Sequence, residues 1–280
     1  MRVQVWGSRG TIAAPGAETS RYGGNTACVE VRPTDGGVIV LDAGTGARAL
    51  GLALVEESPP RIDLLITHLH VDHVEGLGVF EPIWREETDL HIWGPASPVA
   101  SLEDRIATYF SPPLFPIHLS EVPANCTFHD APEGTWRIGA ATLHSEPILH
   151  PGATVGFRIE ADGVALTYLT DHEPALGVDL ETASTDWISG FALAFGADTL
   201  IHDCQYTPRE YEHRVGFGHS STEHVATFAG RAGVERLVLF HHDPMHTDDQ
   251  LEAMRERVLE RWQVDPGRCA IAADGATIEV

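Results

Sequence analysis

The chain has 280 residues, of which 43% are hydrophobic and 21% are charged. These proportions are those of ordinary globular proteins and exclude a collagen-like, fibrous or disordered chain. The formal net charge is −23. We therefore expect neither long nucleic acid nor a membrane as a partner, because phosphate binding draws on Lys and Arg. A small phosphorylated substrate held by metal ions remains compatible with this charge.

Cysteine usage and the N-terminal segment favour a cytoplasmic protein. The four cysteines show no CxxC spacing, which argues against a zinc ribbon or a redox dithiol. We expect them to be reduced and mostly buried, because a chain of this size does not need disulfides. The first residues, MRVQVWGSRG, lack the apolar core of a signal peptide, and no apolar run of about 18 residues predicts a membrane span.

The first half of the chain predicts strands separated by glycine-rich turns. Apolar and alternating segments predict a helix and four strands, namely a helix at 47–55 and strands at 2–6, 28–31, 38–41 and 62–67. The last of these is a short apolar run typical of a strand buried on both faces. It leads directly into His68, and a helix is expected to begin near Asp72.

The middle third is less regular. Strands are expected at 91–93, 141–145, 154–160, 164–170 and 200–202. The segment 110–117 contains three prolines among aromatic and aliphatic residues, which is typical of a loop. This loop could form one wall of a substrate pocket or simply pack against the core.

The C-terminal third predicts two helices with a strand between them. Ser220 with Glu223, and Thr247 with Gln250, have the spacing of capping boxes. The strand is expected at 234–240. The second helix would place one apolar face inward, formed by Leu251, Met254, Val258 and Trp262. With no repeat and no linker, we expect one domain over residues 1–280, built from two β-rich halves covered by helices.

A histidine-rich motif, His68-Leu69-His70-Val71-Asp72-His73, follows the buried strand. His68 and His70 alternate along extended backbone, so their side chains point the same way. Asp72 and His73 come one turn later and can face a neighbouring point. No packing requirement calls for these residues after an apolar strand, so the motif indicates a site for two adjacent metal ions.

Four residues cannot complete two metal sites, so further ligands should follow other strands. His150, Asp171 and His241 each come after an apolar segment, and active-site residues of α/β folds lie at such strand ends. Each of the three alone is equally compatible with a capping or supporting role. Together with the motif they indicate a complete site.

With these motifs on hand, the sequence resembles the metallo-β-lactamase superfamily of binuclear metallohydrolases, nearest the branch of ribonuclease Z and related small phosphodiesterases. The resemblance covers nearly the whole chain and rests on the stretches HLHVDH (68–73), ILHPG (148–152), LTD (169–171), GHS (218–220) and LFHHDP (239–244). It implies an α/β fold, a four-layer αβ/βα sandwich with the site at one edge.

The resemblance also implies a ligand set. The first metal would be bound by His68, His70 and His150, and the second by Asp72, His73 and His241, with Asp171 bridging the two. The family motif places its ligand directly after the strand, which selects His241 over His242. Asp42 would hold a ligand histidine by a hydrogen bond, although it could equally form a turn.

The implied cofactors are two divalent metal ions. Mixed imidazole and carboxylate ligands favour Zn²⁺, with Mn²⁺ or Fe as alternatives. Two ions about 3.5–4 Å apart can hold a bridging hydroxide and clamp the oxygens of a phosphoryl group. We expect Asp72 to help orient that hydroxide.

A leaving alkoxide also needs a proton. The resemblance implies His219 of the GHS motif as the donor, and His242 is the alternative. Asp203 matches an acidic residue of the same branch and could orient His219. Arg9, Arg21 and Tyr22, in the N-terminal loop, are weaker candidates for contact with a substrate phosphate.

The most favoured function is hydrolysis of a small phosphodiester such as a cyclic nucleotide. A lactone or thioester hydrolase of the same superfamily would share every ligand. A tRNA 3′-processing nuclease is less favoured, because that enzyme carries a long basic arm between its third histidine and the bridging aspartate. Here only 21 positions separate His150 from Asp171. A non-enzymatic metal-binding module is also less favoured, since all seven ligands are present. This branch often dimerises, so a homodimer is a candidate assembly.

Overall fold

The computed structural model describes residues 1–280 and contains two seven-stranded sheets that face each other. The first sheet has the strand order β14-β1-β2-β3-β4-β5-β6 and the second has the order β13-β12-β11-β10-β9-β8-β7. The first comprises β1 (Arg2–Gly7), β2 (Cys28–Arg32), β3 (Ile39–Leu41), β4 (Ile62–Leu65), β5 (Asp89–Gly94), β6 (Asn125–Asp130) and β14 (Thr277–Glu279). The second comprises β7 (Gly134–Ile138), β8 (Ala141–Pro147), β9 (Val155–Ala161), β10 (Val164–Leu169), β11 (Thr199–Asp203), β12 (Arg236–Phe240) and β13 (Cys269–Ile271).

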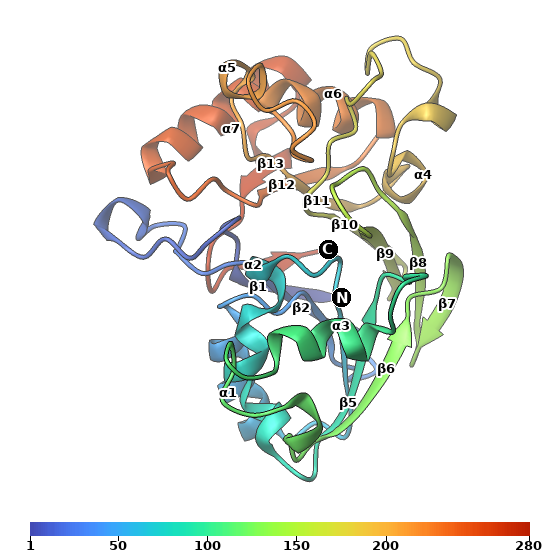
Figure 1. The fold of residues 1–280 in the computed structure, drawn as a ribbon. Helices are drawn as coiled ribbons and strands as arrows, with labels where there is room; N and C mark the ends of the chain where they lie inside the picture. The colour runs from blue at the N-terminus through green and yellow to red at the C-terminus, as the bar shows by residue number, and fades with distance from the viewer.

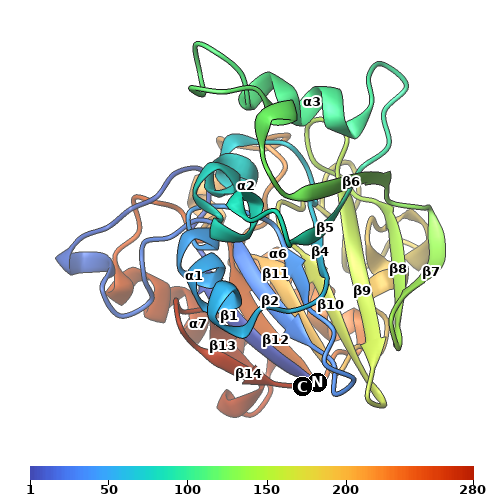
Figure 2. The same ribbon diagram turned by 90° about the horizontal axis from the view of Figure 1, so that it is seen from below.

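Helices cover the outer faces of both sheets (Figures 1 and 2). The α-helices are α1 (Ala47–Glu57), α2 (Val71–Val74), α3 (Leu102–Tyr109), α4 (Phe191–Ala194), α5 (Pro208–Tyr211), α6 (Thr222–Ala232) and α7 (Asp248–Trp262). The short 3₁₀ helices are Ala17–Thr19, Glu75–Val79, Glu81–Trp84, Leu119–Glu121, Thr185–Trp187 and Pro266–Arg268. None of these helices combines the length and the apolar composition that a membrane span requires.

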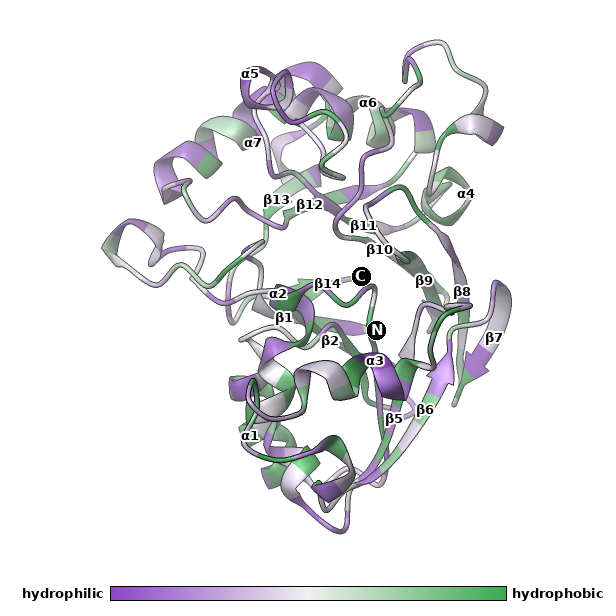
Figure 3. Cartoon of the chain, viewed as in Figure 1, coloured by the Kyte–Doolittle hydropathy of each residue, from purple (hydrophilic) through white to green (hydrophobic).

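Three buried clusters fill the spaces between these layers. One lies between the sheets and includes Val5, Phe157 and Phe240. The other two join α1 and α3 to the first sheet, and α6 and α7 to the second. Apolar colour accordingly gathers on the central strands, while much of α7 is hydrophilic (Figure 3). The four-layer αβ/βα sandwich expected from the sequence is thus confirmed. The single-domain assignment for residues 1–280 stays a prediction.

Parallel pairing brings the functional segments to one edge. In the first sheet β3, β4 and β5 run parallel, and in the second β10, β11, β12 and β13 do so. The carboxyl ends of parallel strands meet at the same edge of a sheet. The carboxyl ends of β3, β4, β10, β11 and β12 and the residues just after them therefore converge, and they carry Asp42, His68, Asp171, Asp203 and His241.

Two helix predictions need correction. The helix expected near Asp72 is a single α-turn followed by 3₁₀ turns, because its first residues must turn Asp72 and His73 inward at the strand end. The helix after the GHS motif begins one residue later than expected. Ser221, not Ser220, caps it and accepts a hydrogen bond from the backbone N–H of His224. The Ser220 hydroxyl instead donates to the carbonyl of His172. The capping box of Thr247 and Gln250 is confirmed.

Candidate metal centre

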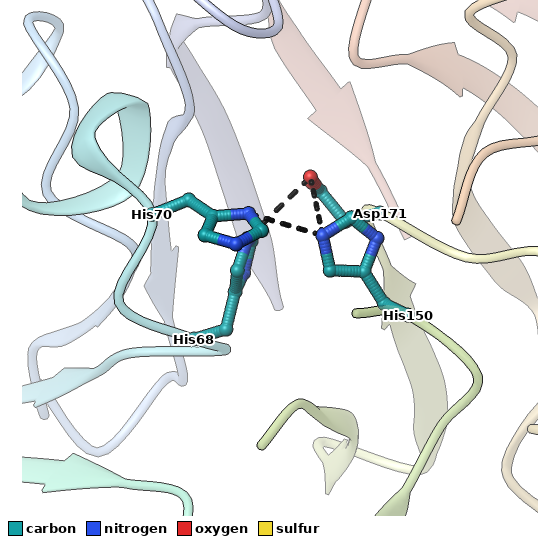
Figure 4. A group of neighbouring side chains, drawn as sticks. All are labelled: His68, His70, His150 and Asp171. Carbon is teal, nitrogen blue, oxygen red and sulfur yellow. Dashed lines mark hydrogen bonds and ion pairs between the residues drawn. The ribbon is translucent and has the colours of Figure 1, made fainter. Parts of the chain in front are cut away.

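The first cluster brings together the side chains of His68, His70, His150 and Asp171 (Figure 4). His150 Nε2 lies 3.1 Å from His70 Nδ1 and 3.7 Å from Asp171 Oδ2. His68 Nε2 lies 3.5 Å from the same carboxylate oxygen. Three imidazoles and one carboxylate thus face one point, and they come from three separate segments of the chain.

The second cluster consists of Asp72, His73, Asp171 and His241, all of them buried. His73 Nε2 lies 3.1 Å from Asp171 Oδ1 and 3.3 Å from Asp72 Oδ2. His241 Nε2 lies 3.1 Å and 3.2 Å from the same two oxygens. Asp171 therefore turns Oδ2 toward the first cluster and Oδ1 toward the second, as a ligand shared by two ions must.

The donor spacing fits metal coordination. Donors on a tetrahedral ion at Zn–N and Zn–O distances of about 2.0–2.1 Å lie about 3.3 Å apart, close to the 3.1–3.7 Å separations found here. Nε2 of His68 and Nε2 of His73 are buried and have no hydrogen-bond partner. Such orphaned nitrogens are costly unless something else occupies the site.

The buried carboxylates of the two clusters also favour positive charge between them. Burial acts to lower the pKa of His241, but the carboxylates of Asp171, Asp72 and Asp203 outweigh it and raise that pKa to about 9. Burial acts to raise the pKa of Asp171, yet the surrounding histidines hold it well below its usual value. The buried carboxylates thus remain ionised and need counter-charge, which either protons on the histidines or bound cations would supply.

The backbone is strained at the residues that carry these groups. Non-glycine residues with positive φ include Asp42 (58°), Asp171 (48°) and His241 (54°), each within two residues of the end of a strand. Thr11, at 67°, is a fourth, and its N–H donates to Asp72 Oδ2 at 2.6 Å. Left-handed conformations of this kind are unfavourable for residues with a Cβ and tend to gather at functional sites.

Asp42 supports the second cluster as the resemblance implies. Its buried carboxylate accepts a hydrogen bond from His73 Nδ1 at 2.9 Å, which leaves Nε2 facing Asp72 and Asp171. The Thr67 hydroxyl and the Tyr168 hydroxyl donate to the same carboxylate. On the other side of the site, His150 Nδ1 donates to the carbonyl of Gly218 at 2.9 Å, which orients that imidazole. Outer contacts of this kind fix the tautomer and angle of ligand histidines.

His219 and Asp203 form a pair beside the clusters. His219 Nδ1 lies 2.6 Å from Asp203 Oδ2, and its ring stacks on His241 with centroids 4.9 Å apart. His219 lines the pocket that opens over the clusters, so its Nε2 is free to meet a substrate. His242, the alternative proton donor, points away: it is buried and its Nε2 donates to the carbonyl of Ala272. Burial lowers its pKa to about 3.

The pocket over the clusters has a volume of about 540 Å³. Several expected contributors lie elsewhere. Phe110 is fully buried and Phe115 packs on it with ring centroids 4.2 Å apart, while Pro112, Pro113 and Leu114 are exposed. No residue of this proline-rich loop lines the pocket. Arg9 is buried and donates to backbone carbonyls. Arg21 and Tyr22 bind acidic side chains of α7. None of these side chains lines the pocket.

The sequence reasoning missed the wall formed by residues 205–217. Gln205, Tyr206, Arg214 and Phe217 all line the pocket. Glu173 was missed as well: it is buried and accepts hydrogen bonds from Tyr211 Oη and from the N–H groups of Gly216 and Gly218. Its position two residues after Asp171 was the only available signal.

Comparison with known proteins agrees with this architecture. The family model described as "Beta-lactamase superfamily domain" matches residues 38–242. This chain belongs to the metallo-β-lactamase superfamily. The chain is a metal-dependent hydrolase. It is 28% identical over 262 residues to a ribonuclease Z of Mycobacterium bovis, covering 87% of this chain and 85% of that protein.

Two solved structures share the fold of this superfamily member. The metallo-β-lactamase fold protein YhfI from Bacillus subtilis is 16% identical, with a TM-score of 0.71 and 99% of each chain covered. A protein described as a new diphosphatase from the PhnP family is 17% identical, with a TM-score of 0.69, covering 100% of this chain and 97% of that one. At these identities the likeness concerns the fold alone.

Proposed function

We propose that this metallo-β-lactamase superfamily member hydrolyses a small phosphodiester, such as a cyclic nucleotide, with two divalent ions. The observation that carries the proposal is the placement of Asp171, whose two oxygens face two separate four-residue clusters. His68, His70 and His150 would hold one ion and Asp72, His73 and His241 the other. The imidazole and carboxylate donors favour Zn²⁺.

When bound, such ions make a water molecule acidic enough to lose a proton near neutral pH and neutralise charge on phosphoryl oxygens. The chain itself supplies orientation and a proton. The N–H of Thr11 holds Asp72 Oδ2 in place. Asp203 holds His219 by Nδ1, so a proton on His219 Nε2 is available to the oxygen of the leaving group.

A small substrate is favoured over RNA by the segment between His150 and Asp171. This segment contains little more than the hairpin of β9 and β10, closed by Asp162 and Gly163, so it offers no extended arm. The net charge of −23 would oppose a long polyanion. RNA 3′-end processing is the second candidate, because the ribonuclease Z relative covers most of the chain.

The first test is hydrolysis of bis(p-nitrophenyl) phosphate by chelated protein resupplied with Zn²⁺ or Mn²⁺. We expect metal-dependent turnover that falls at least 1,000-fold in Asp171→Ala, on the scale of losing the metal's contribution. Protein shown to contain two ions per chain but unable to cleave this diester would refute the proposal, and lactones and thioesters would then be tested.

A second assay distinguishes hydrolysis of a small diester from processing of RNA. A cyclic nucleotide and a precursor tRNA with a 3′ trailer are offered to the same metal-loaded protein. We expect cleavage of the cyclic nucleotide only. Accurate removal of the trailer, with the cyclic nucleotide left intact, would show that the second candidate is correct.

A further inference from the structure

A single permanently charged cation lines the metal pocket. The chain has no lysine, so all 18 of its basic residues are arginines. Of these, only Arg214 lines the pocket over the clusters. Its guanidinium makes no ion pair and no side-chain hydrogen bond within the chain, although acidic residues outnumber basic ones by 41 to 18. An unpaired arginine in so acidic a protein leaves all its donors free for a ligand.

The guanidinium is held in place by stacking. Arg214 Cζ lies 4.9 Å from the centroid of the Tyr206 ring, a cation–π contact that favours this position of the guanidinium. Tyr206 in turn packs edge-to-face against His219, with centroids 5.7 Å apart. Its hydroxyl has no partner within the chain, although only 4% of the residue is exposed. A guanidinium and a phenol hydroxyl thus both offer free donors on the same wall of the pocket.

Hydrogen bonds to the carboxylate of Glu173 hold the segment that carries Arg214. The buried carboxylate of Glu173 binds Tyr211 Oη and the N–H of Gly216, both at 2.8 Å, and the N–H of Gly218 at 2.7 Å. These contacts bracket Arg214 on both sides in the chain. The carbonyl of Gly218 also orients His150, so the wall and the first cluster share one rigid support. Arg214 is therefore positioned before any ligand binds, which lowers the entropic cost of binding.

We infer that Arg214, with Tyr206, forms a subsite for a second phosphoryl group of the substrate, one that is not held at the clusters. The inference rests on the proposed function, in which the two clusters take the scissile group. Arg214 belongs to neither cluster and is separated from them by Tyr206 and His219. The exposed side chains of Phe217 and Val71, which also line the pocket, offer apolar surface for the body of the substrate. The substrate class is a nucleotide-sized diester that bears an additional phosphate.

A matched pair of chromogenic substrates tests the subsite. One is the p-nitrophenyl ester of thymidine 5′-phosphate, and the other is the same compound with a 3′-phosphate. We expect kcat/KM to be at least 10-fold higher for the second in the wild type. In Arg214→Gln this preference should fall by about 10-fold, because a charge-assisted contact is lost. Arg209→Gln removes the same charge from the same segment but does not line the pocket, and it should keep the preference.

Binding provides a readout that does not depend on turnover. Titration calorimetry of metal-loaded protein compares thymidine 3′,5′-bisphosphate with thymidine 5′-phosphate. We expect the bisphosphate to bind about 10-fold more tightly in the wild type and in Arg209→Gln, but not in Arg214→Gln. A wild type without preference, or equal losses on both ligands in Arg214→Gln, would overturn the inference. Absence of turnover together with preserved selective binding would instead overturn the proposed function and leave the subsite standing.

Discussion

The carboxylate of Asp171 is the single group that both clusters share. It is buried, it follows β10, and its left-handed backbone turns the side chain back toward the other strand ends. Strain at such a residue persists only where the surrounding structure holds it. The same holds for His241, whose ring is fixed between Asp72 on one side and His219 on the other. At the scale of residues, the site is therefore built before any cation arrives.

A first prediction concerns the proton donor. His219→Gln should reduce kcat by about 100-fold or more on a diester with an alkyl leaving group, because an alkoxide needs a proton. The loss should be much smaller on bis(p-nitrophenyl) phosphate, since p-nitrophenolate leaves readily as an anion. Steady-state kinetics on the two substrates provide the measurement. Equal losses on both would show that His219 has a different role, such as support of His241.

A second prediction concerns Asp42. Asp42→Asn should weaken metal affinity by about 10- to 100-fold, because an uncharged amide is a weaker acceptor for His73 Nδ1 than the carboxylate is. Metal content after dialysis against a graded chelator measures this effect. Tyr168→Phe serves as the control: it removes one hydrogen bond to Asp42 but leaves the contact with His73 intact. If both variants retained metal equally well, Asp42 would have no influence on the ligand histidine.

The residue assignments show what the sequence can and cannot provide. The motifs that carry the candidate ligands could be recognised because their histidines and aspartates come shortly after apolar strands. Their assignment as metal ligands stays a prediction. The resemblance to the family motif selected His241 over His242, and in the structure His242 Nε2 bonds to the carbonyl of Ala272. Arg214 was not recognisable as a pocket residue, because its place depends on the contacts of Glu173, 41 positions earlier. No local pattern reports such a contact.

At the scale of elements, turns do as much as strands to form the site. The loop after β1 passes so close to the second cluster that a Cβ on Gly10 would lie 2.3 Å from the His241 ring. The N–H of Gly10 also donates to the carbonyl of His242, and the loop continues to Thr11, which binds Asp72. Two segments more than 200 positions apart are thereby packed against each other at the second cluster.

A third prediction follows from this close approach. Gly10→Ala should displace the His241 ring, because the added methyl group would overlap it and the packed turn leaves no other space. We expect this displacement to abolish binding of one metal ion. Gly16→Ala is a matched control in the same loop, where the nearest atom lies 3.8 Å from the added carbon. Metal analysis of the two variants should give about one and two ions per chain, respectively. Two firmly bound ions in Gly10→Ala would contradict the proposed role of this turn.

The elements themselves were predictable to different degrees. The buried parallel strands β4, β10 and β12 stand out by their apolar runs. The strands β6 and β7 and the helix α3 were missed, because most residues of β6 and β7 are partly or fully exposed and lack a clear apolar alternation. β6 and β7 are stabilised by pairing with β5 and β8, respectively. The few residues of each strand do not reveal such a partner.

At the scale of the whole molecule, the two halves are joined near the site by the chain's beginning and end. Asp274 accepts hydrogen bonds from the N–H and the side-chain amide of Asn25, while its other oxygen is buried without a partner. Burial raises the pKa of Asp274 to about 6. In the unfolded chain the pKa of this carboxyl has its ordinary value, about 3.9.

A fourth prediction concerns pH and stability. Because the pKa of Asp274 is higher in the folded protein, its contribution to stability is fully present below about pH 4 and is lost as the pH rises through 6. Asp274→Asn mimics the protonated form. Relative to the wild type it should gain up to about 3 kcal/mol in the free energy of unfolding between pH 4 and 7. Urea unfolding across this range measures the gain.

Asp186→Asn is the control for the loss of one charge, since Asp186 is exposed and makes no side-chain contact. Asp186→Asn should show no comparable gain in the free energy of unfolding as the pH rises from 4 to 7. A difference between Asp274→Asn and the wild type that stays constant from pH 4 to 7 would mean that Asp274 titrates normally in the folded protein.

The central claim is that one aspartate joins two metal sites, and a metal titration tests it most directly. Metal-depleted protein is titrated with Zn²⁺ while bound metal and turnover of bis(p-nitrophenyl) phosphate are followed together. We expect saturation at about two ions per chain, with turnover appearing as the second ion binds, and neither feature in Asp171→Ala. Full activity with a single ion per chain, or two tightly bound ions in Asp171→Ala, would contradict the account.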